Sequence, residues 1–270
     1  MAKSSVKSSG VYRIADKWAK TNVMLTDEGL RSYIPVTKKL SKQMLSTMLE
    51  KHGMVYVKPA FGSLGKGVMR VERLSGDPSS GYIYQLGGER KTFQSFQPLY
   101  RSIMKDAGGR VYLVQRGIHV LTYNGRPFDL RLVVQQSPSG GWEVTGTVAR
   151  VAHPGKIVTN GSQGGTIVPV EQALQGYGNP LQRIKLMRQL ERIGVSTMRK
   201  LHRRYPGLRE LGLDIALDQG LKPWILEVNT TPDHCPFAIL RDQTMITRIV
   251  HYGSQYGRKY RLNCFKAQRG

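Results

Sequence analysis

Three oxygen-bearing side chains in the second half of the chain have a spacing that suits a metal site. In WILEVN, residues 224–229, Glu227 and Asn229 are two apart at the end of an apolar run, so a strand would point both to the same face. A second strand-like run carries Asp214, and hairpin pairing through a turn at Gly220 would bring it opposite the Glu227 region. Hard oxygen ligands without His or Cys favour Mg²⁺, whose coordination shell is completed by water and substrate phosphates. The alternative is a pair of polar strand ends with a turn at Asn229.

A lysine followed by a glycine-rich loop lies in the first half of the chain. VYVKPAFGSLGKGV predicts a buried strand that ends at Pro59, with Lys58 next to a loop that contains Gly62, Gly65 and Gly67. Glycine lets backbone N–H groups approach a phosphate closely, and lysine adds a point charge. It is not a Walker A loop, because Gly67 is followed by Val68 instead of Lys and then Ser or Thr, and the HRD and DFG elements of protein kinases are missing. The loop alone is also typical of an ordinary hairpin turn.

Strand-like and helix-like segments alternate along the chain, which is typical of a mixed α/β or α+β protein. The expected helices are residues 40–52, 98–108, 180–205 and 237–257. The expected strands are residues 54–61, 68–74, 81–88, 90–96, 110–118, 128–137, 142–153, 211–218 and 223–229. The two metal-site runs are therefore the last two strands, and the lysine ends the first one.

The longest expected helix begins at Asn179, which can cap it, and Pro180, which is favoured in a first turn. Pro206 ends it. Its apolar positions predict one buried face, made of Leu181, Ile184, Leu190, Ile193 and Leu201.

Composition narrows the function classes. No run approaches the roughly 18 consecutive apolar residues of a membrane span, and MAKSSVKSSG is not followed by the apolar core of a secretion signal, so the cytosol is the expected location. Cys235 and Cys264 show no CxxC spacing for zinc, and we interpret them as two reduced thiols.

The formal charge of +23 calls for an anionic partner. Basic residues are spread along the whole chain, without an RRM, zinc-finger or zipper signature, so specific nucleic-acid binding is disfavoured. A nonspecific attraction to anionic surfaces remains open.

Eight short motifs, taken in order, resemble the ATP-grasp superfamily. They are DKW, VYVKP, GSLGKG, LVQRGI, FDLRLVV, TNGSQGG, LGLDIALD and LEVN. Within that superfamily the chain is most similar to the YheC/YheD-type endospore coat-associated proteins, from about residue 16 to residue 256. The resemblance implies an α+β fold of two lobes that hold ATP between them.

The resemblance also implies a domain organisation. Residues 16–115 would form the N-terminal lobe with the phosphate loop, and residues 116–257 the C-terminal lobe with the magnesium site. We expect residues 1–15 to be a disordered segment and residues 258–270 a basic tail. Related ligases usually carry a further N-terminal domain, whereas about 15 residues precede DKW here.

Roles for individual residues follow from the matched motifs. The expected nucleotide contacts are Lys17, Lys58, Gly62, Ser63, Gly65, Gly67, Gln115, Arg116, Gly117, Ile118 and Asn160. Of these, the lysines would contact phosphates, the glycine loop would cover them, and residues 115–118 would present backbone groups to adenine. Asp214, Glu227 and Asn229 match the magnesium triad. Arg131 and Arg150 match arginines that face the reacting phosphate, and Asn160 with Gly164 and Gly165 matches a loop near the metal and the acceptor.

The resemblance predicts a Mg²⁺- and ATP-dependent ligase that joins an unknown carboxylate to an unknown amine through an acylphosphate. The positive charge would suit an acidic peptide or envelope polymer as substrate. One alternative is a spore-coat-associated structural protein that binds nucleotide without turnover, and another is a basic nucleic-acid-binding protein. An oligomer and a place in the spore coat both stay open.

Overall fold

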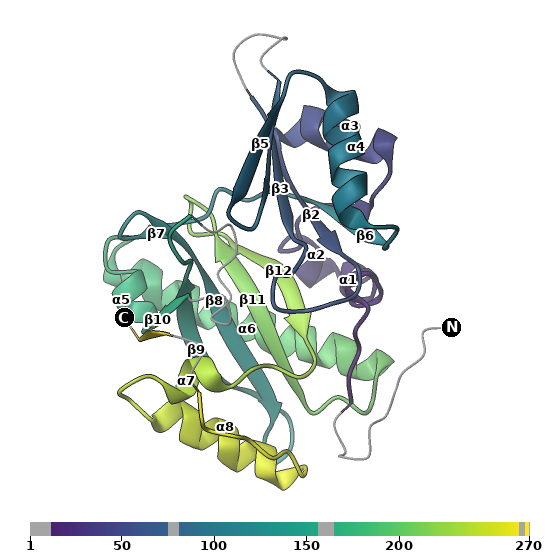
Figure 1. Ribbon diagram of the computed structural model, residues 1–270. Coiled ribbons are helices and arrows are strands. Elements are labelled where there is room, and N and C mark those ends of the chain that lie inside the picture. Colours follow the sequence, from purple (N-terminus) through teal and green to yellow (C-terminus); the bar gives the residue numbers. More distant parts are fainter. Residues whose placement is uncertain (1–11, 75–80, 156–164, 265–267, 270) are drawn as a thin grey trace. The chain divides into compact units, whose positions relative to one another are not determined.

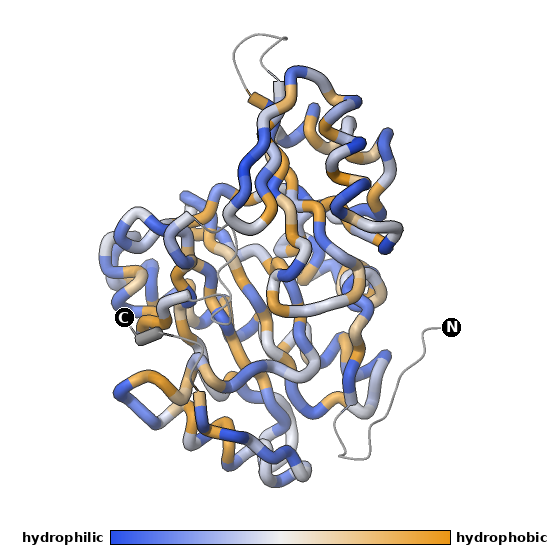
Figure 2. Tube along the Cα trace, in the orientation of Figure 1, coloured by the Kyte–Doolittle hydropathy of each residue, from blue (hydrophilic) through white to orange (hydrophobic). Residues whose placement is uncertain are grey.

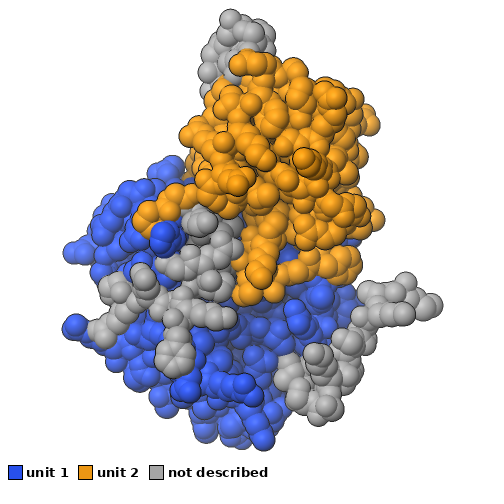
Figure 3. Space-filling view, viewed as in Figure 1, with its two compact units in different colours: residues 1–34, 120–153, 159–270 blue, residues 35–119, 154–158 orange. Residues whose placement is uncertain are grey.

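The computed structural model describes residues 12–74, 81–155, 165–264 and 268–269 (Figure 1). The chain divides into two compact units (Figure 3). Unit 1 comprises residues 1–34, 120–153 and 159–270, and unit 2 comprises residues 35–119 and 154–158. Each unit combines a sheet with helices, which confirms the α+β fold class. Asn160, Gly164 and residues 1–11 of the expected disordered segment lie outside the described residues.

Unit 2 is built on an antiparallel sheet. Six strands of its described residues pair in the order β1-β6-β2-β3-β4-β5. They are β1 (Thr37–Lys39), β2 (Met54–Pro59), β3 (Met69–Arg73), β4 (Tyr82–Leu86), β5 (Glu89–Phe93) and β6 (Tyr112–Arg116). Helices α3 (Lys42–His52) and α4 (Phe96–Ala107) contribute Leu45, Leu49, Leu99 and Ile103 to a core with Val55, Val57 and Val114. The strands and helices expected here are confirmed, whereas β1 was not anticipated.

Unit 1 is built on a larger sheet. Its described strands pair in the order β12-β11-β8-β9-β10-β13, with β7 beside β8. They are β7 (Thr122–Tyr123), β8 (Arg126–Gln136), β9 (Trp142–Val151), β10 (Thr166–Val168), β11 (Glu210–Leu217), β12 (Pro223–Asn229) and β13 (Gln268–Arg269). Its helices are α1 (Lys17–Leu25), α2 (Glu28–Arg31), α5 (Val170–Ala173), α6 (Pro180–Arg204), α7 (Cys235–Ala238) and α8 (Thr244–Gln255).

Helices cover both faces of the unit 1 sheet. Leu130 and Leu132 of β8 pack with α6 on one face, together with residues of α1 and α2. Because side chains alternate along a strand, Val133 of β8 lies on the other face, with Phe237 of α7 and Ile249 of α8. Figure 2 shows hydrophobic and hydrophilic residues alternating along the helices, as expected where one side is buried. None of the described helices is long and apolar enough to cross a membrane.

Helix α6 starts as the sequence predicts, because the side chain of Asn179 accepts a hydrogen bond from the backbone N–H of Gln182 and the Gln182 side chain returns one. Leu190, Ile193 and Leu201 are buried as expected. The prediction was wrong for Leu181 and Ile184, whose exposed fractions are 59% and 51%. At about 100° per residue, Ile184 points about 120° away from Leu190 and Leu181 about 180° away.

Two further expectations are wrong near the C-terminus. Cys235 and Cys264 form a disulfide, with 5.3 Å between their Cα atoms, instead of two reduced thiols. Their local spacing could not reveal this, because the partners are 29 residues apart and meet only through the fold. The single helix expected over residues 237–257 is divided into α7 and α8. Residues 239–243 separate the two helices, and the Asp242 side chain there accepts a hydrogen bond from the Thr244 backbone N–H.

The packing of α6 predicts a contrast between two substitutions. Leu201→Ala should lower the free energy of unfolding by about 2–5 kcal/mol, because it leaves a cavity in the core. Ile184→Ala, in the same helix, should change it by less than about 0.5 kcal/mol, because that side chain is half exposed. Urea denaturation measures both, and equal losses would contradict this orientation of α6.

Candidate metal and phosphate sites

The expected metal ligands lie together on one face of the unit 1 sheet. Asp214 of β11 is the direct cross-strand partner of Glu227 of β12, as the hairpin prediction required. Asn229 is two residues further along β12, so its side chain shares the face of Glu227. Asp214 is buried, whereas Glu227 and Asn229 are partly exposed.

Two arginines extend this group across the sheet. Asp214 is also the direct partner of Arg131 on β8, and the Arg131 Nε donates to Asp214 Oδ1 at 2.7 Å. An Arg150 terminal nitrogen on β9 lies 3.0 Å from Asp214 Oδ2. Arg150 is paired in register with Asp129 of β8 and donates to both its carboxylate oxygens, at 2.8 and 2.6 Å. We call Asp129, Arg131, Arg150 and Asp214 the charged row.

Asp129 was missed by the sequence analysis. The signal was present in FDLR, where Asp129 and Arg131 are two apart on an expected strand and must share a face. The arginines were expected to face a phosphate, and the structure pairs both with carboxylates.

The charged row is buried, and its two positive and two negative charges sum to zero. Each residue is at most 6% exposed, and two guanidinium groups face two carboxylates. Burial would raise the pKa of Asp214, but Arg131 and Arg150 outweigh it and hold that pKa below its ordinary value. Burial would lower the pKa of Arg150, but Asp129 and Asp214 raise it. Asp214 is therefore ionised at neutral pH, as a metal ligand must be.

The donor set fits Mg²⁺. A carboxylate offers about four lone-pair positions, so an Asp214 that accepts from two arginines still has acceptor capacity. Glu227 and Asn229 add two further oxygens on the same face. Lys17, the first residue of α1, places its Nζ 3.6 Å from Glu227 Oε1. An expected phosphate contact thus stands beside an expected metal ligand within unit 1.

In unit 2, Lys58 is held by a short polar chain. Its Nζ donates to Gln115 Oε1 at 2.8 Å, and the Gln115 Nε2 donates to Thr37 Oγ1 at 2.9 Å. All three side chains are buried. Gln115 therefore positions the lysine through its side chain, a role that the sequence analysis did not assign to it.

The loop after Lys58 is a turn whose backbone depends on glycine. Gly62 has a φ of 125° and Gly67 a φ of 74°, values that residues with a Cβ rarely adopt. A Cβ on Gly67 would also lie 2.8 Å from the Tyr112 hydroxyl. Ser63 and Gly65 lie in the same turn, and Gly65 also has a positive φ, of 67°.

The segment expected to meet adenine continues β6. The Arg116 N–H donates to the Val36 carbonyl at 2.8 Å, and the Gly117 N–H donates to the Met54 carbonyl at 2.9 Å. These two donors are committed to unit 2 itself, and Ile118 follows them as a buried residue. An adenine edge bound here would have to use other backbone groups of the segment.

Comparison with known proteins settles the family. The YheC/D-like ATP-grasp family matches residues 11–259. The chain belongs to this family. It is 25% identical over 230 residues to the endospore coat-associated protein YheD of Bacillus subtilis (strain 168), and 28% identical over 222 residues to YheC of the same organism. These matches cover 83% and 81% of this chain, but only 49% of YheD and 60% of YheC. The ATP-grasp resemblance is confirmed, and the chain spans about half to three fifths of these relatives' length.

The charged row predicts a large effect of one neutralising substitution. Asp214→Asn should lower the free energy of unfolding by about 3–5 kcal/mol, because it leaves two buried arginines with one carboxylate. Glu227→Gln is the matched control in the opposite strand, and its partly exposed position predicts a loss below about 1 kcal/mol. Chemical denaturation at neutral pH measures both.

The loss of unfolding free energy in Asp214→Asn should also depend on pH. Because the folded-state pKa of Asp214 is below its ordinary value of 3.8, its stabilising contribution is present above that value and is lost as the pH falls through the folded-state pKa. The gap between parent and Asp214→Asn should therefore narrow in acid. A gap that stays constant down to pH 2 would contradict the assignment.

Proposed function

We propose that the protein is an ATP- and Mg²⁺-dependent carboxylate–amine ligase. The observation that carries this proposal is the single sheet face on which Asp214, Glu227 and Asn229 lie next to Arg131 and Arg150. Oxygen ligands for a divalent cation and guanidinium groups for a phosphoryl group are the two requirements of phosphoryl transfer from ATP. Membership of the ATP-grasp family supports the same reaction class.

The proposed reaction has two steps. A substrate carboxylate oxygen attacks the γ-phosphorus of ATP, the bond to the β-phosphate oxygen breaks, and ADP leaves. An amine then attacks the carbonyl carbon of the acylphosphate, inorganic phosphate leaves, and the amine loses a proton. Mg²⁺ would supply charge neutralisation at the phosphate oxygens when bound to Asp214, Glu227 and Asn229.

The chain's own side chains would orient and stabilise the transferred group. Charge spreads over the phosphoryl oxygens in the transition state, and Arg131 and Arg150 can donate several N–H groups to it. Their pairing with Asp214 and Asp129 limits side-chain motion, so little reorganisation is needed when charge develops. Lys17 and Lys58 would contact the other phosphates, and the glycine loop at residues 62–67 would cover them.

For the substrates, we propose only a chemical class. A formal charge of +23 favours an acidic peptide or polymer as the carboxylate substrate, whose binding would weaken as salt screens the charges. The alternative function is nucleotide binding without turnover in a coat-associated structural protein. It is favoured by the names of the relatives YheC and YheD, and it would place the protein in the spore coat instead of the cytoplasm.

ADP release with hydroxylamine tests the ligase proposal without knowledge of the natural amine. Hydroxylamine traps an acylphosphate as a hydroxamate, so poly-glutamate and a panel of simple carboxylates can be screened with ATP and Mg²⁺. We expect hydroxamate and ADP in equal amounts with at least one carboxylate. Arg131→Met should lower the rate by about 10²–10³-fold, as the loss of one oriented donor does elsewhere.

The control for this assay is Arg73→Met, in which an exposed arginine at the end of β3 is removed. Its rate should equal that of the parent. Saturable ATP binding without ADP release from any carboxylate would favour the structural alternative. Hydroxamate formation that Arg131→Met leaves unchanged would remove the charged row from the mechanism.

A further inference from the structure

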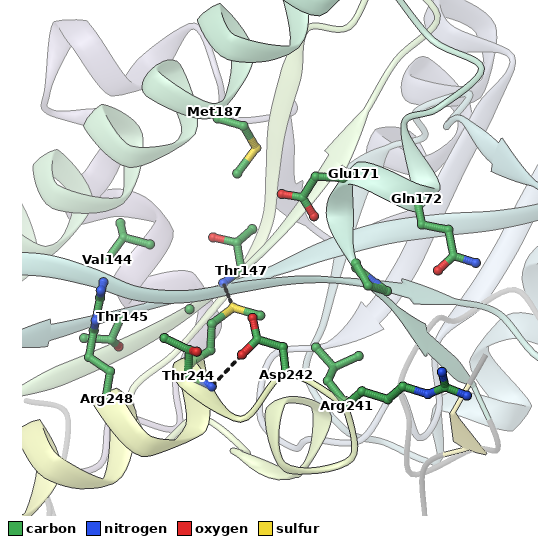
Figure 4. Close-up of a pocket in the computed structure, with 14 residues that line it drawn as sticks. Val144, Thr145, Thr147, Glu171, Gln172, Met187, Arg241, Asp242, Thr244 and Arg248 are labelled. Atoms are coloured by element: carbon green, nitrogen blue, oxygen red, sulfur yellow. Dashed lines mark hydrogen bonds between the residues drawn. The ribbon is translucent and has the colours of Figure 1, made fainter.

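A groove in unit 1 runs along one edge of its sheet, and none of its lining residues belongs to the charged row. It has a volume of about 930 Å³ and is lined by β9, by Glu171 of α5 and Met187 of α6, and by Met245 and Arg248 of α8. Figure 4 shows Thr147 between Met187 and Glu171 on one side and Thr244 and Arg248 on the other. We call it the edge groove.

The floor of the edge groove is the part of β9 that extends beyond the end of its neighbour, β10. Strand β10 pairs with β9 only from Val151 to Ala149, and its last residue is Val168. Pro169 follows, which has no backbone N–H to continue the ladder, and α5 begins at Val170. In the part of the chain that the structure describes, residues 142–148 of β9 therefore pair with β8 alone.

The backbone of Thr147 points into this open edge. The Ala152 N–H donates to the Pro127 carbonyl on β8, which makes Phe128 and Val151 a non-hydrogen-bonded pair. Pairs alternate along an antiparallel ladder, so Ala149 and Thr147 also turn their N–H and C=O groups away from β8. Ala149 pairs with Val168, the last residue of β10, whereas Thr147 is two residues beyond that pair.

The acceptor that Thr147 does find is a poor one. Its N–H donates to the Met245 Sδ at 3.3 Å, and a thioether sulfur is a weak acceptor on a flexible side chain. A backbone carbonyl from an added strand would satisfy this donor better than the sulfur does. The outward carbonyl of Thr147 offers the complementary acceptor.

The walls of the edge groove suit one added strand. Met187 and Met245 present flexible apolar side chains on opposite sides of the strand edge, where alternate residues of an added strand would point. Ile184, half exposed on α6, lies in an adjoining hollow of about 650 Å³ that shares Met187 and Arg248 with the groove. Helices on both sides of the edge leave less room for a second whole sheet than for a single extended segment.

The charges around the groove favour an acidic segment. Its lining and that of the adjoining hollow include four arginines, at positions 183, 188, 241 and 248, against three acids, Glu171, Glu191 and Asp242. The formal charge of +23 adds a long-range attraction of the same sign.

We propose that the edge groove binds an extended, acidic peptide segment of a partner protein as an added strand beside residues 142–148 of β9. The segment would run antiparallel to β9, in line with β10, and its backbone would pair with Thr147 in place of the Met245 sulfur. Apolar residues of the segment would pack on Met187 and Met245, and its acidic residues would meet the arginines. This binding site is independent of the proposed ligase reaction.

The probe for this site is a fluorescein-labelled seven-residue peptide of alternating Glu and Val, titrated with the full chain. We expect a saturable rise in anisotropy and slower amide hydrogen exchange in residues 142–148, Thr147 included. The same peptide with its central backbone amides N-methylated should bind about tenfold more weakly, because it cannot complete the ladder. A Lys–Val peptide should bind more weakly than the Glu–Val peptide.

A pair of charge reversals separates the groove from general attraction to a basic protein. Arg248→Glu changes an exposed wall residue and should weaken binding of the Glu–Val peptide by about tenfold. Arg203→Glu changes an exposed residue near the end of α6 and should leave the affinity for this peptide within about twofold of that of the parent. Unchanged melting temperatures verify that both variants are folded. Equal binding of the N-methylated peptide, equal effects of the two reversals, or absent protection at residues 142–148 would overturn the proposal. So would protection of those residues by self-association, detected as a concentration-dependent dimer in ultracentrifugation without peptide.

Discussion

Two arginines and two aspartates, buried on one face of the unit 1 sheet, can remain charged only because they neutralise one another. Each pair is also a cross-strand pair: Asp129 is opposite Arg150, and Arg131 is opposite Asp214. A slip of one residue between β8 and either neighbour would move these charges to opposite faces and leave them without partners. Charge neutralisation therefore fixes the register of β8, β9 and β11.

The same constraint positions the candidate chemistry. On the other side of β11, Asp214 is the direct partner of Glu227 on β12, and Asn229 follows on the same face. The arginines thus have two roles in this account, because they stabilise the ionised Asp214 in the folded protein and would donate to a transferred phosphoryl group. In unit 2 two neutral side chains, Gln115 and Thr37, hold a single lysine, Lys58, through hydrogen bonds.

Local features of the sequence were sufficient to predict much of the fold and of the candidate metal site. The Asp214–Glu227 pairing could be predicted because a short turn joins two strongly apolar strands, and α6 could be predicted from its cap and its length. Contacts between distant segments could not: the Cys235–Cys264 disulfide and the side-chain role of Gln115 depend on how remote strands and loops meet. The buried face of α6 was wrong at its start, because Leu181 and Ile184 are apolar but point about 180° and 120° away from the buried Leu190.

The family match and the geometry support each other at different levels. Membership of the YheC/D-like ATP-grasp family gives the fold and supports the proposed reaction class, and the sheet register shows which residues of this chain lie together on one face. Neither identifies the substrates, since the chain spans 49% of YheD and 60% of YheC. The edge groove raises the separate question of which acidic segment this protein recruits.

Isothermal titration calorimetry of ATP, with and without Mg²⁺, measures whether Asp214, Glu227 and Asn229 bind Mg²⁺ together with ATP. We expect that Mg²⁺ strengthens ATP binding to the parent, and that this gain falls by at least about tenfold, or ~1.4 kcal/mol, in Glu227→Gln and in Asn229→Leu. Binding without Mg²⁺ should be similar in all three. An equal Mg²⁺ gain in the parent and both variants would show that these side chains do not bind the ion.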